Sequence, residues 1–239
     1  MRVQIFGSRL SPFVEKVVRA LALKGIPYTM VDVRSPADFK RWNPQTGKMP
    51  VLEVDGERVY DSTLILRRLD ALVPDPPLFD PDPQVAARQR FLEDWADESL
   101  YWYGMALRWS AVNAAATVQQ VVGSVPVPAL LRPLIGFVFR RRVTAQAQAQ
   151  GLARLPLDVL VGELARRLDE LVVWLGDRPY FFADRPSGAD LAIFGQLSML
   201  QSGPTPQAAE LLRARPALAG FYTRLDAATQ ARTATSAAA

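Results

Sequence analysis

The sequence contains neither cysteine nor histidine, and these two absences exclude whole classes of chemistry. Without cysteine, the chain can form no disulfide, no CxxC redox centre and no protein thiolate nucleophile. Without histidine, it offers no Ser-His dyad and no imidazole ligand for a metal. Any chemistry must therefore use hydroxyls, carboxylates, backbone amides or a bound cofactor, and we expect no metal site.

Lysine is also scarce, with four lysines among 28 basic residues, and the net charge is only +4. No basic stripe interleaved with aromatic residues is present, although such a stripe marks most nucleic-acid-binding surfaces. We therefore expect no nucleic-acid partner. The chain has 239 residues, of which 49% are hydrophobic, and these values favour a globular protein of one large or two modest domains.

The apolar stretches do not have the form of targeting or membrane-spanning segments. Val3–Phe6 is too short for the apolar region of a signal peptide, which favours a cytoplasmic location. Val121–Phe139 is strongly apolar, but three prolines and Arg132 interrupt it, and a spanning helix needs about twenty mostly apolar residues. We expect a buried segment between helices, with contact to a membrane surface or a protein partner as the alternative.

The first 72 residues alternate between strand and helix patterns. Short apolar runs predict strands at 3–6, at 28–33 and on both sides of Asp55-Gly56, a turn sequence typical of a hairpin. Proline and serine at helix starts, with apolar residues at helical spacing, predict the intervening helices. These predicted helices cover residues 12–24, 36–42 and 62–72. The element order is therefore β-α-β-α-β-β-α.

A stretch with five prolines at 73–83 has no helical period and predicts a stiff, extended linker. Beyond it, the apolar spacing is helical throughout. The predicted helices cover residues 84–112, 142–150, 157–175, 189–199 and 216–227. The sequence thus predicts an α/β domain at 1–72, an all-α domain at 84–228 and, because it is rich in Ala and Thr, a flexible tail at 229–239.

Three motifs occur in order along the chain. Gly7–Val14 (GSRLSPFV) places hydroxyl groups at the amino end of a helix, and Asn43–Leu52 (NPQTGKMPVL) is followed by Asp61-Ser62. The third motif is Ser187–Ala192 (SGADLA). In this order, over nearly the whole chain, the set resembles the glutathione transferase superfamily. The resemblance implies a thioredoxin-like N-terminal domain that binds glutathione and an all-helical C-terminal domain.

The second motif supplies the residues expected to hold glutathione. Proline at the start of the third strand of such a fold usually follows a cis bond, so we predict a cis bond between Met49 and Pro50. The Met49 backbone would then pair with a peptide lying alongside it like an added strand. The resemblance implies that Ser62 takes the γ-glutamyl carboxylate, Asp61 the ammonium group and Lys48 the glycyl carboxylate. The alternatives are a trans proline, a helix capped by Ser62 or Asp61, and a solvated lysine.

The first motif supplies the candidate catalytic residue. The nucleophile would be the thiolate of glutathione, and a hydroxyl donor at a helix amino end would stabilise it. Ser11 is the first candidate and Ser8 its rival, and the third possibility is that both only cap the helix. In the superfamily, cysteine at the Ser11 position is typical of thiol-transfer classes, so serine favours thiolate activation.

The C-terminal half supplies a structural motif and a candidate substrate wall. Ser187–Asp190 has the form of a capping box that starts a core helix, and we assign it no chemistry. An apolar electrophile would bind between the domains, with core packing as the alternative role for the aromatic residues there. The candidate wall residues are Phe13, Tyr101, Trp102 and Trp109.

Two C-terminal segments, Arg141–Gly151 and Pro179–Gly195, also resemble metaxin-like and failed-axon-connections-like relatives, not all of which are transferases. The predicted function is conjugation of glutathione, or a similar low-molecular-weight thiol, to a small apolar electrophile by a detoxification enzyme that forms a homodimer. The alternatives are a non-catalytic binding or scaffold protein, and a glutathione-dependent reductase or dehalogenase. Fold and activity are separable, so the motifs leave these alternatives open.

Overall fold

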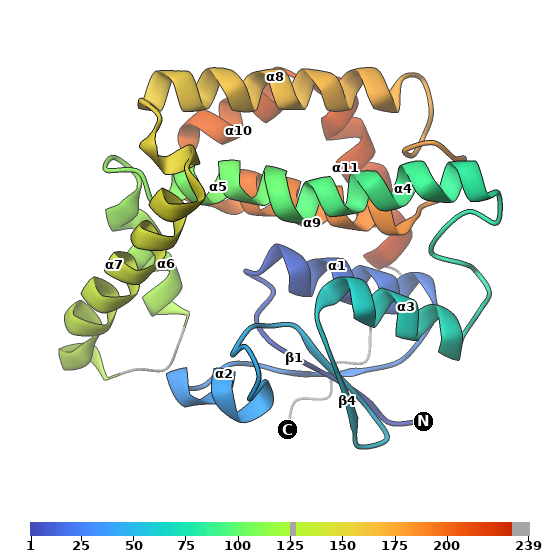
Figure 1. The fold of residues 1–239 in the computed structure, drawn as a ribbon, viewed down its shortest axis with the longest axis horizontal. Coiled ribbons are helices and arrows are strands. Elements are labelled where there is room, and N and C mark those ends of the chain that lie inside the picture. Colours follow the sequence, from blue (N-terminus) through green and yellow to red (C-terminus); the bar gives the residue numbers. More distant parts are fainter. Residues whose placement is uncertain (125–127, 231–239) are drawn as a thin grey trace.

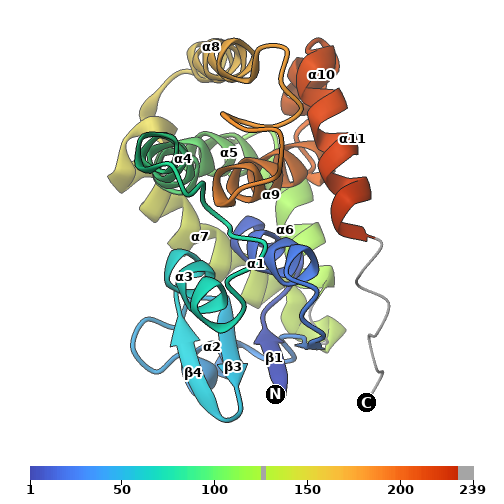
Figure 2. The same cartoon turned by 90° about the vertical axis from the view of Figure 1, so that its right-hand side faces the viewer.

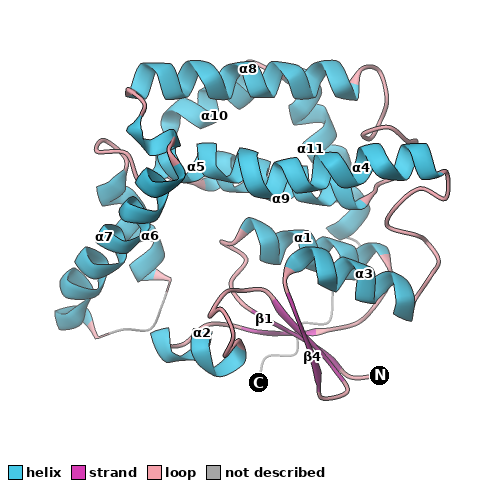
Figure 3. Cartoon of the chain, in the orientation of Figure 1, coloured by secondary structure: helices cyan, strands magenta, loops and turns pink. Residues whose placement is uncertain are grey.

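The computed structural model describes residues 1–124 and 128–230. A small α/β layer lies against a larger group of helices (Figure 1). The strands all belong to the first sixty residues, and every later element of the described residues is helical (Figure 3). This arrangement confirms the predicted thioredoxin-like α/β domain followed by an all-α domain.

The N-terminal half has the predicted element order. Its elements are β1 (Val3–Phe6), α1 (Pro12–Leu23), β2 (Thr29–Val31), α2 (Pro36–Trp42), β3 (Val51–Val54), β4 (Glu57–Tyr60) and α3 (Ser62–Leu72). The strands lie in the order β2-β1-β3-β4, with β2 parallel to β1 and the other two pairings antiparallel. The second strand is shorter than the predicted 28–33, and the other bounds differ from the prediction by about a residue.

Successive residues of the central strands point to opposite faces of the sheet. Ile5 and Leu52, which are partners in the β1–β3 register, belong to the main core with α1 and α3. Phe6 and Val51, the next pair, belong to a second cluster with Trp42 of α2, and the rings of Phe6 and Trp42 lie 5.1 Å apart. Helices therefore cover both faces of the sheet, with α1 and α3 above the strands in Figure 2.

The described part of the C-terminal half is built from helices and helical turns. These are α4 (Pro83–Trp95), η1 (Ala96–Leu100), α5 (Tyr101–Arg108), α6 (Ala114–Gly123), η2 (Ala129–Leu131), α7 (Arg132–Gln150), η3 (Leu152–Arg154), α8 (Leu157–Leu175), α9 (Gly188–Ser202), α10 (Pro206–Arg213) and α11 (Pro216–Gln230). α4, η1 and α5 form one continuous rod with a π-helical turn in its middle (Figure 1). The rod ends at Arg108 rather than at the predicted residue 112, and α6 and α10 were not predicted. α11 continues to Gln230, so the first two residues of the predicted tail at 229–239 are helical, and the others lie outside the described residues.

α9 is the central helix of the C-terminal half, with twelve of its 15 residues buried. The predicted capping box at its start is confirmed, because the Ser187 hydroxyl and the Asp190 carboxylate each bond the other's backbone. A Cβ atom at Gly195 would lie only 2.4 Å from the carbonyl oxygen of Pro12. The missing side chain therefore lets α9 approach the start of α1 closely.

The apolar stretch Val121–Phe139 is not the buried inter-helix segment that the sequence predicts. It contributes the end of α6, η2 and the first half of α7, while residues 125–127 lie outside the described residues. Proline is tolerated at Pro133, in the first turn of α7, because an amide hydrogen there would have no partner in the helix. Within η2 and the first half of α7, only Gly136 is buried. α6 and α7 form a hairpin that projects from the other helices (Figure 1), and no described helix is long and apolar enough to cross a membrane.

The segment 73–83 is bonded to both halves of the molecule. The Lys24 ammonium group donates to the carbonyl oxygens of Val73, at 2.6 Å, and Pro76, at 2.7 Å. Leu78 is buried, and its carbonyl oxygen accepts the amide of Gly188, at the start of α9, at 2.6 Å. The linker is therefore fixed along its length.

Candidate active site

Three turns of the N-terminal half lie at the same edge of the sheet. Phe6 pairs with Val51, and Val51 pairs with Tyr60, so these three residues form one row across β1, β3 and β4. The residues that follow this row outward are Gly7, Pro50 and Asp61. The register thus brings the three predicted site segments of this half together.

Gly7 places the turn after β1 directly against the loop before β3. It has a φ of 146°, and a Cβ atom built on it would lie 3.4 Å from Cβ of Met49 and 2.6 Å from the Val14 side chain. A larger residue would therefore clash with the Val14 side chain of α1, and its positive φ would be strained. This contact gives the glycine of the first motif a specific structural role.

Ser11 is the N-cap residue of α1, but its side chain forms no capping hydrogen bond. Its backbone amide donates to the carbonyl oxygen of Ser8 at 2.9 Å, and its own carbonyl oxygen accepts the amide of Glu15 at 3.0 Å. The side chain of Ser8 accepts the amide of Leu10 at 3.3 Å. Both serines are half-buried, and the hydroxyl of Ser11 is the one that capping does not use.

The loop before β3 is held by Asn43, whose role the sequence did not reveal. Its buried side-chain amide donates to Thr46 Oγ1 at 2.8 Å and to the carbonyl oxygen of Lys48 at 2.9 Å. The peptide bond between Met49 and Pro50 is cis, as predicted. The side chain of Lys48 is exposed.

Asp61 caps α3. Its carboxylate accepts the amides of Thr63 at 2.9 Å and Leu64 at 3.3 Å, which was one of the alternatives left open. Its φ of 75° is unusual for a residue with a side chain and is the kind of local strain that often marks functional sites. The cap bonds go to Thr63 and Leu64 rather than to Ser62, which is buried as the first residue of the helix. A helix start of this kind suits a carboxylate ligand.

A buried ion cluster lies directly behind Ser62. The fully buried ammonium group of Lys16 donates to Glu93 and, at 2.6 Å, to Asp97, and it lies 3.4 Å from the Ser62 hydroxyl. Thr63 Oγ1 donates to Glu93 at 2.6 Å. The cluster therefore joins α1 and α3 to the α4–η1 rod across the contact between the two halves.

Asp97 is the least satisfied member of this cluster. One of its oxygens, Oδ1, is buried and has no hydrogen-bond partner among the described residues. Burial raises the pKa of Asp97 to about 6, although the Lys16 ammonium group opposes the shift. Asp97 lies in η1, and π-helical turns are frequent at functional sites. This cluster was not predicted from the sequence, although charged residues such as Lys16 among the apolar residues of 14–22 were a possible signal.

The predicted aromatic wall is only partly assembled. The rings of Phe13 and Tyr101 lie 4.9 Å apart, and those of Tyr101 and Trp102 lie 5.2 Å apart, so these three residues form one group near the start of α1. Burial raises the pKa of Tyr101 to about 12. Trp109 lies elsewhere, in a small core with Ala114 and Val143.

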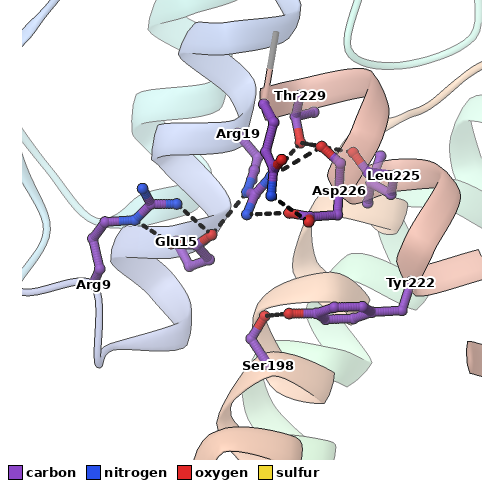
Figure 4. Close-up of polar contacts among 9 residues, drawn as sticks. Arg9, Glu15, Arg19, Ser198, Tyr222, Leu225, Asp226 and Thr229 are labelled. Carbon is purple, nitrogen blue, oxygen red and sulfur yellow. Dashed lines mark hydrogen bonds and ion pairs between the residues drawn. The ribbon is translucent and has the colours of Figure 1, made fainter. Parts of the chain in front are cut away.

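A second ion network connects the Ser8–Ser11 turn to the last helix. Arg9 binds Glu15 through two nitrogens, each at 2.8 Å, and Arg19 donates to the same carboxylate at 2.7 Å (Figure 4). Arg19 also pairs with Asp226 at 2.7 Å and donates to Thr229 at 2.6 Å, both in α11. Burial would raise the pKa of Glu15, but the two guanidinium groups lower it below its usual value.

Within the part of the chain that the structure describes, neither a hollow on the protein surface nor a metal site adds to the candidate site. A shallow hollow lies beside α2, and it is lined by none of the predicted site residues. Among the described residues, no group of three or more acidic side chains is placed to hold a metal ion.

Comparisons with known proteins identify both halves. The family model described as "Glutathione S-transferase, N-terminal domain" matches residues 10–72, and the model for the C-terminal domain matches residues 164–225. A Zea mays protein named glutathione transferase GST 23 is 38% identical over 40% of this chain and 45% of its own length. The chain thus spans about half the length of the curated relatives it matches first.

Two further proteins match over most of their length. An isoprene-epoxide–glutathione S-transferase from a Rhodococcus strain is 27% identical over 82% of each chain. The crystal structure of a Methylobacterium radiotolerans glutathione S-transferase in complex with glutathione sulfonate is 26% identical, covers 100% of this chain and 97% of its own, and has a TM-score of 0.64. The chain therefore belongs to the glutathione S-transferase superfamily, with an N-terminal and a C-terminal domain of that superfamily.

Proposed function

We propose that the protein is an enzyme that conjugates glutathione, or a similar low-molecular-weight thiol, to a small apolar electrophile. One observation carries this proposal most directly. The Ser11 hydroxyl lies at the amino end of α1, at the end of the turn whose first residue, Gly7, contacts the Met49 loop, and no capping bond uses it. It can therefore donate a hydrogen bond to a thiolate, which is the reactive form of the thiol.

The neighbouring residues would hold the peptide and the second substrate. The backbone of Met49, beside Pro50, would pair with the peptide, while the start of α3 at Ser62 would take a carboxylate. We assign Asp61 to the ammonium group of the peptide and the exposed Lys48 to its other carboxylate. The paired rings of Phe13 and Tyr101, with Trp102 beside them, would form the apolar wall, and we leave Trp109 out of it because it packs in a separate core.

The reaction needs no other reactant. The thiolate sulfur forms a bond to an electrophilic carbon, and the bond from that carbon to its leaving group breaks. With a chloro-dinitroarene, chloride leaves; with an epoxide, the ring opens and the oxygen takes a proton from solvent. A Rhodococcus relative is named for isoprene epoxide, so a small apolar epoxide is the second substrate to assay.

Ser11→Ala is the decisive test. We expect turnover at neutral pH to fall ten- to a hundredfold, equivalent to about 1.4–2.7 kcal/mol, with little change in KM for glutathione. The ultraviolet absorbance of the bound thiolate, titrated against pH, should show a higher thiol pKa in the variant. Ser8→Ala is the matched control and should titrate like the natural protein. If Ser11→Ala and the natural protein give the same titration, Ser11 only begins the helix. Ser8 or backbone amides would then have to donate hydrogen bonds to the thiolate.

The other predicted roles have their own tests. Product analysis separates conjugation from the reductase or dehalogenase alternative, because those reactions end in oxidised glutathione. The homodimer remains a prediction, and the exposed apolar side chains of Leu64 in α3 and Phe91 in α4 support it. Sedimentation velocity of the natural chain and of Phe91→Ser tests that prediction. The cytoplasmic location and the metaxin-like affinity of the C-terminal half also remain predictions.

A further inference from the structure

The far end of the α6–α7 hairpin carries five exposed apolar side chains within nine residues. Their exposed fractions lie between 46% and 91%. They are Leu130, Leu131, Leu134, Phe137 and Val138. Single apolar side chains are common on soluble proteins, whereas a contiguous group marks a surface that another molecule covers. We call these five residues the apolar tip.

The packing of α7 fixes which way the tip faces. The buried residues of α7 are Gly136, Val143 and Ala147, which follow one side of the helix. A Cβ atom at Gly136 would lie 2.6 Å from the Val118 side chain, so this side is pressed against α6. Each residue turns an α-helix by about 100°, so positions two before and two after Gly136 lie about 160° around it. Leu134 and Val138 therefore lie on the side of α7 that faces away from α6, and the other three residues of the tip are exposed around the same end of the helix.

The charge around the tip has one sign. Residues 99–157 contain six arginines and no acidic residue, so the rest of the chain carries 22 basic residues against 24 acidic ones. Three of these arginines, Arg140, Arg141 and Arg142, follow the tip after one intervening residue and are exposed. Among the described residues, none of the three forms an ion pair with an acidic side chain. Exposed apolar and cationic groups thus occur together on one helix.

We propose that the apolar tip and Arg140–Arg142 form a docking surface for an anionic phospholipid bilayer. A bilayer offers both an apolar interior and a layer of negative headgroups. From Leu134 to Arg141 the helix rises about 10 Å, and interfacial apolar groups enter a membrane by about 5–10 Å. With the end of the hairpin pointing into the membrane and the tip at the acyl boundary, the guanidinium groups would lie near the depth of the headgroup phosphates.

Other occupants fit this surface less well. A second copy of the chain would bring two clusters of arginines together, and like charges repel. A nucleic acid would pair with the arginines through its phosphates but would leave the five aliphatic and aromatic side chains of the tip in water. A spanning mode is excluded for the described helices, since none is long and apolar enough.

The docking surface is separate from the glutathione site. None of the tip residues belongs to the turns at Ser11, Met49 and Asp61 that form the candidate site, and the hairpin lies outside both family-model matches, at 10–72 and 164–225. α7 packs mainly on α5, α6 and the short turns that flank it. The proposal therefore stands whether or not the protein conjugates glutathione, and loss of docking should leave turnover of a soluble substrate unchanged.

Sedimentation with vesicles tests the charge requirement. The full chain should bind vesicles of phosphatidylcholine mixed with phosphatidylglycerol, bind pure phosphatidylcholine weakly, and dissociate as salt is raised. Arg140→Gln/Arg141→Gln/Arg142→Gln should lower affinity by up to about a hundredfold, at about fivefold per arginine. The matched control, Arg67→Gln/Arg88→Gln/Arg213→Gln, removes the same charge from exposed positions of α3, α4 and α10 and should bind nearly normally.

A second pair of variants tests the apolar requirement. Leu134→Ser/Phe137→Ser should lower affinity at least tenfold, because both side chains lose their transfer into the membrane. Val173→Ser is its control, since Val173 is 76% exposed on α8. All of these positions are on the surface, so circular dichroism and thermal unfolding should match the natural protein.

The absence of cysteine permits a direct measurement of insertion. Leu134→Cys, labelled with an environment-sensitive nitrobenzoxadiazole dye, should shift its emission to the blue on anionic vesicles, and labelled Val173→Cys should not. The proposal is overturned if the natural chain does not bind anionic vesicles, or if the control variants lose as much affinity as the tip and arginine variants. It is also overturned if the emission of the label at position 134 stays that of a dye in water. It is equally overturned if the tip variants only abolish self-association or RNA binding.

Discussion

Glu15 and Lys16 are neighbours in α1, yet their side chains belong to two different ion networks. Cations outnumber carboxylates around Glu15, and carboxylates outnumber cations around Lys16. Glu15 is one carboxylate between two guanidinium groups, at the edge where α1 meets α11. Lys16 is one ammonium group between two carboxylates, fully buried where α1 meets α3 and α4. Adjacent residues point about 100° apart on a helix, so a single helix serves both contacts.

The difference shows in the titration of the carboxylates. Two guanidinium groups lower the pKa of Glu15 despite its burial, whereas burial raises the pKa of Asp97 despite the single ammonium group beside it. Buried ion pairs stabilise a fold weakly, because desolvation offsets their attraction. The Glu15 network therefore fixes geometry at low electrostatic cost, while the Lys16 cluster is costly and is retained directly behind Ser62. Costly polar groups of this kind are expected at functional sites.

The largest effect should come from breaking the Lys16 cluster. Lys16→Met leaves Glu93 and Asp97 buried without a cation and should lower the free energy of unfolding by about 3–5 kcal/mol. Chemical denaturation measures the change. Adding Glu93→Gln and Asp97→Asn to Lys16→Met should restore much of the stability, because no buried charge then remains. A loss below about 1 kcal/mol for Lys16→Met would mean that water reaches the cluster.

The pH dependence of stability sharpens the comparison. The folded-state pKa of Asp97 is about 6, above its unfolded value of about 3.9, so the folded protein binds an extra proton between these values. The stability that this protonated carboxyl group contributes is present at pH 4 and is lost as the pH rises through 6. Between pH 4 and pH 7, the free energy of unfolding of the natural protein should therefore fall by about 2–3 kcal/mol more than that of Asp97→Asn.

Two other carboxyl groups with shifted pKa values do not obscure the comparison between the natural protein and Asp97→Asn. The pKa of Asp190 is also raised, to about 7, by burial, but it titrates in both proteins and cancels in the difference. Glu15 has a lowered pKa, so its contribution is present above its unfolded value and is lost only at lower pH. Parallel stability curves for the natural protein and Asp97→Asn would contradict the assignment to Asp97.

Breaking the Glu15 network should have a smaller effect. Glu15→Gln weakens the bonds to Arg9 and Arg19 and should lower the free energy of unfolding by about 1–2 kcal/mol. Since the two networks share no partner, the change in unfolding free energy caused by Glu15→Gln should add to the change caused by Asp97→Asn, whatever its sign, within about 0.5 kcal/mol. A strong deviation from additivity in the double variant would show that the networks are coupled through α1.

The smallest effect should come from the outer end of the Glu15 network. Asp226 is partly exposed, and its pairing with Arg19 is therefore screened by solvent. Asp226→Asn should lower the free energy of unfolding by about 0.5–1 kcal/mol, measured by thermal unfolding, and less at high salt. An equal loss at low and high salt would indicate that packing of α11, not charge, is affected.

Local patterns predicted much of the fold because they depend on nearby residues. The capping box at Ser187 and the hairpin at Asp55-Gly56 are complete within a few residues, and both are present. The start of α7 was missed because its residues belong to the apolar stretch that three prolines interrupt, although the first turn of a helix tolerates proline at Pro133. Apolar composition also predicted burial for this helix, but burial depends on which elements lie around it.

The candidate site was predictable only where its motifs are local. The segments at Ser11, Met49 and Asp61 were located from sequence, and the strand register brings them to one edge. The cluster around Lys16 was not predictable, because its members come from positions 16, 62, 63, 93 and 97. Only the packing of α1 against two other helices brings them together, and no short pattern encodes that.

The bonded linker has a consequence for any attempt to divide the chain. A proline-rich segment between two domains is where a protease would be expected to cut, yet Leu78 is buried and the segment is bonded at its start and in its middle. Backbone held in this way cannot enter a protease cleft without local unfolding. Limited proteolysis should therefore spare residues 73–83 until this segment opens. Separately expressed halves would each expose the apolar contact between α1 and α9, and they should be recovered as insoluble fragments unless produced together.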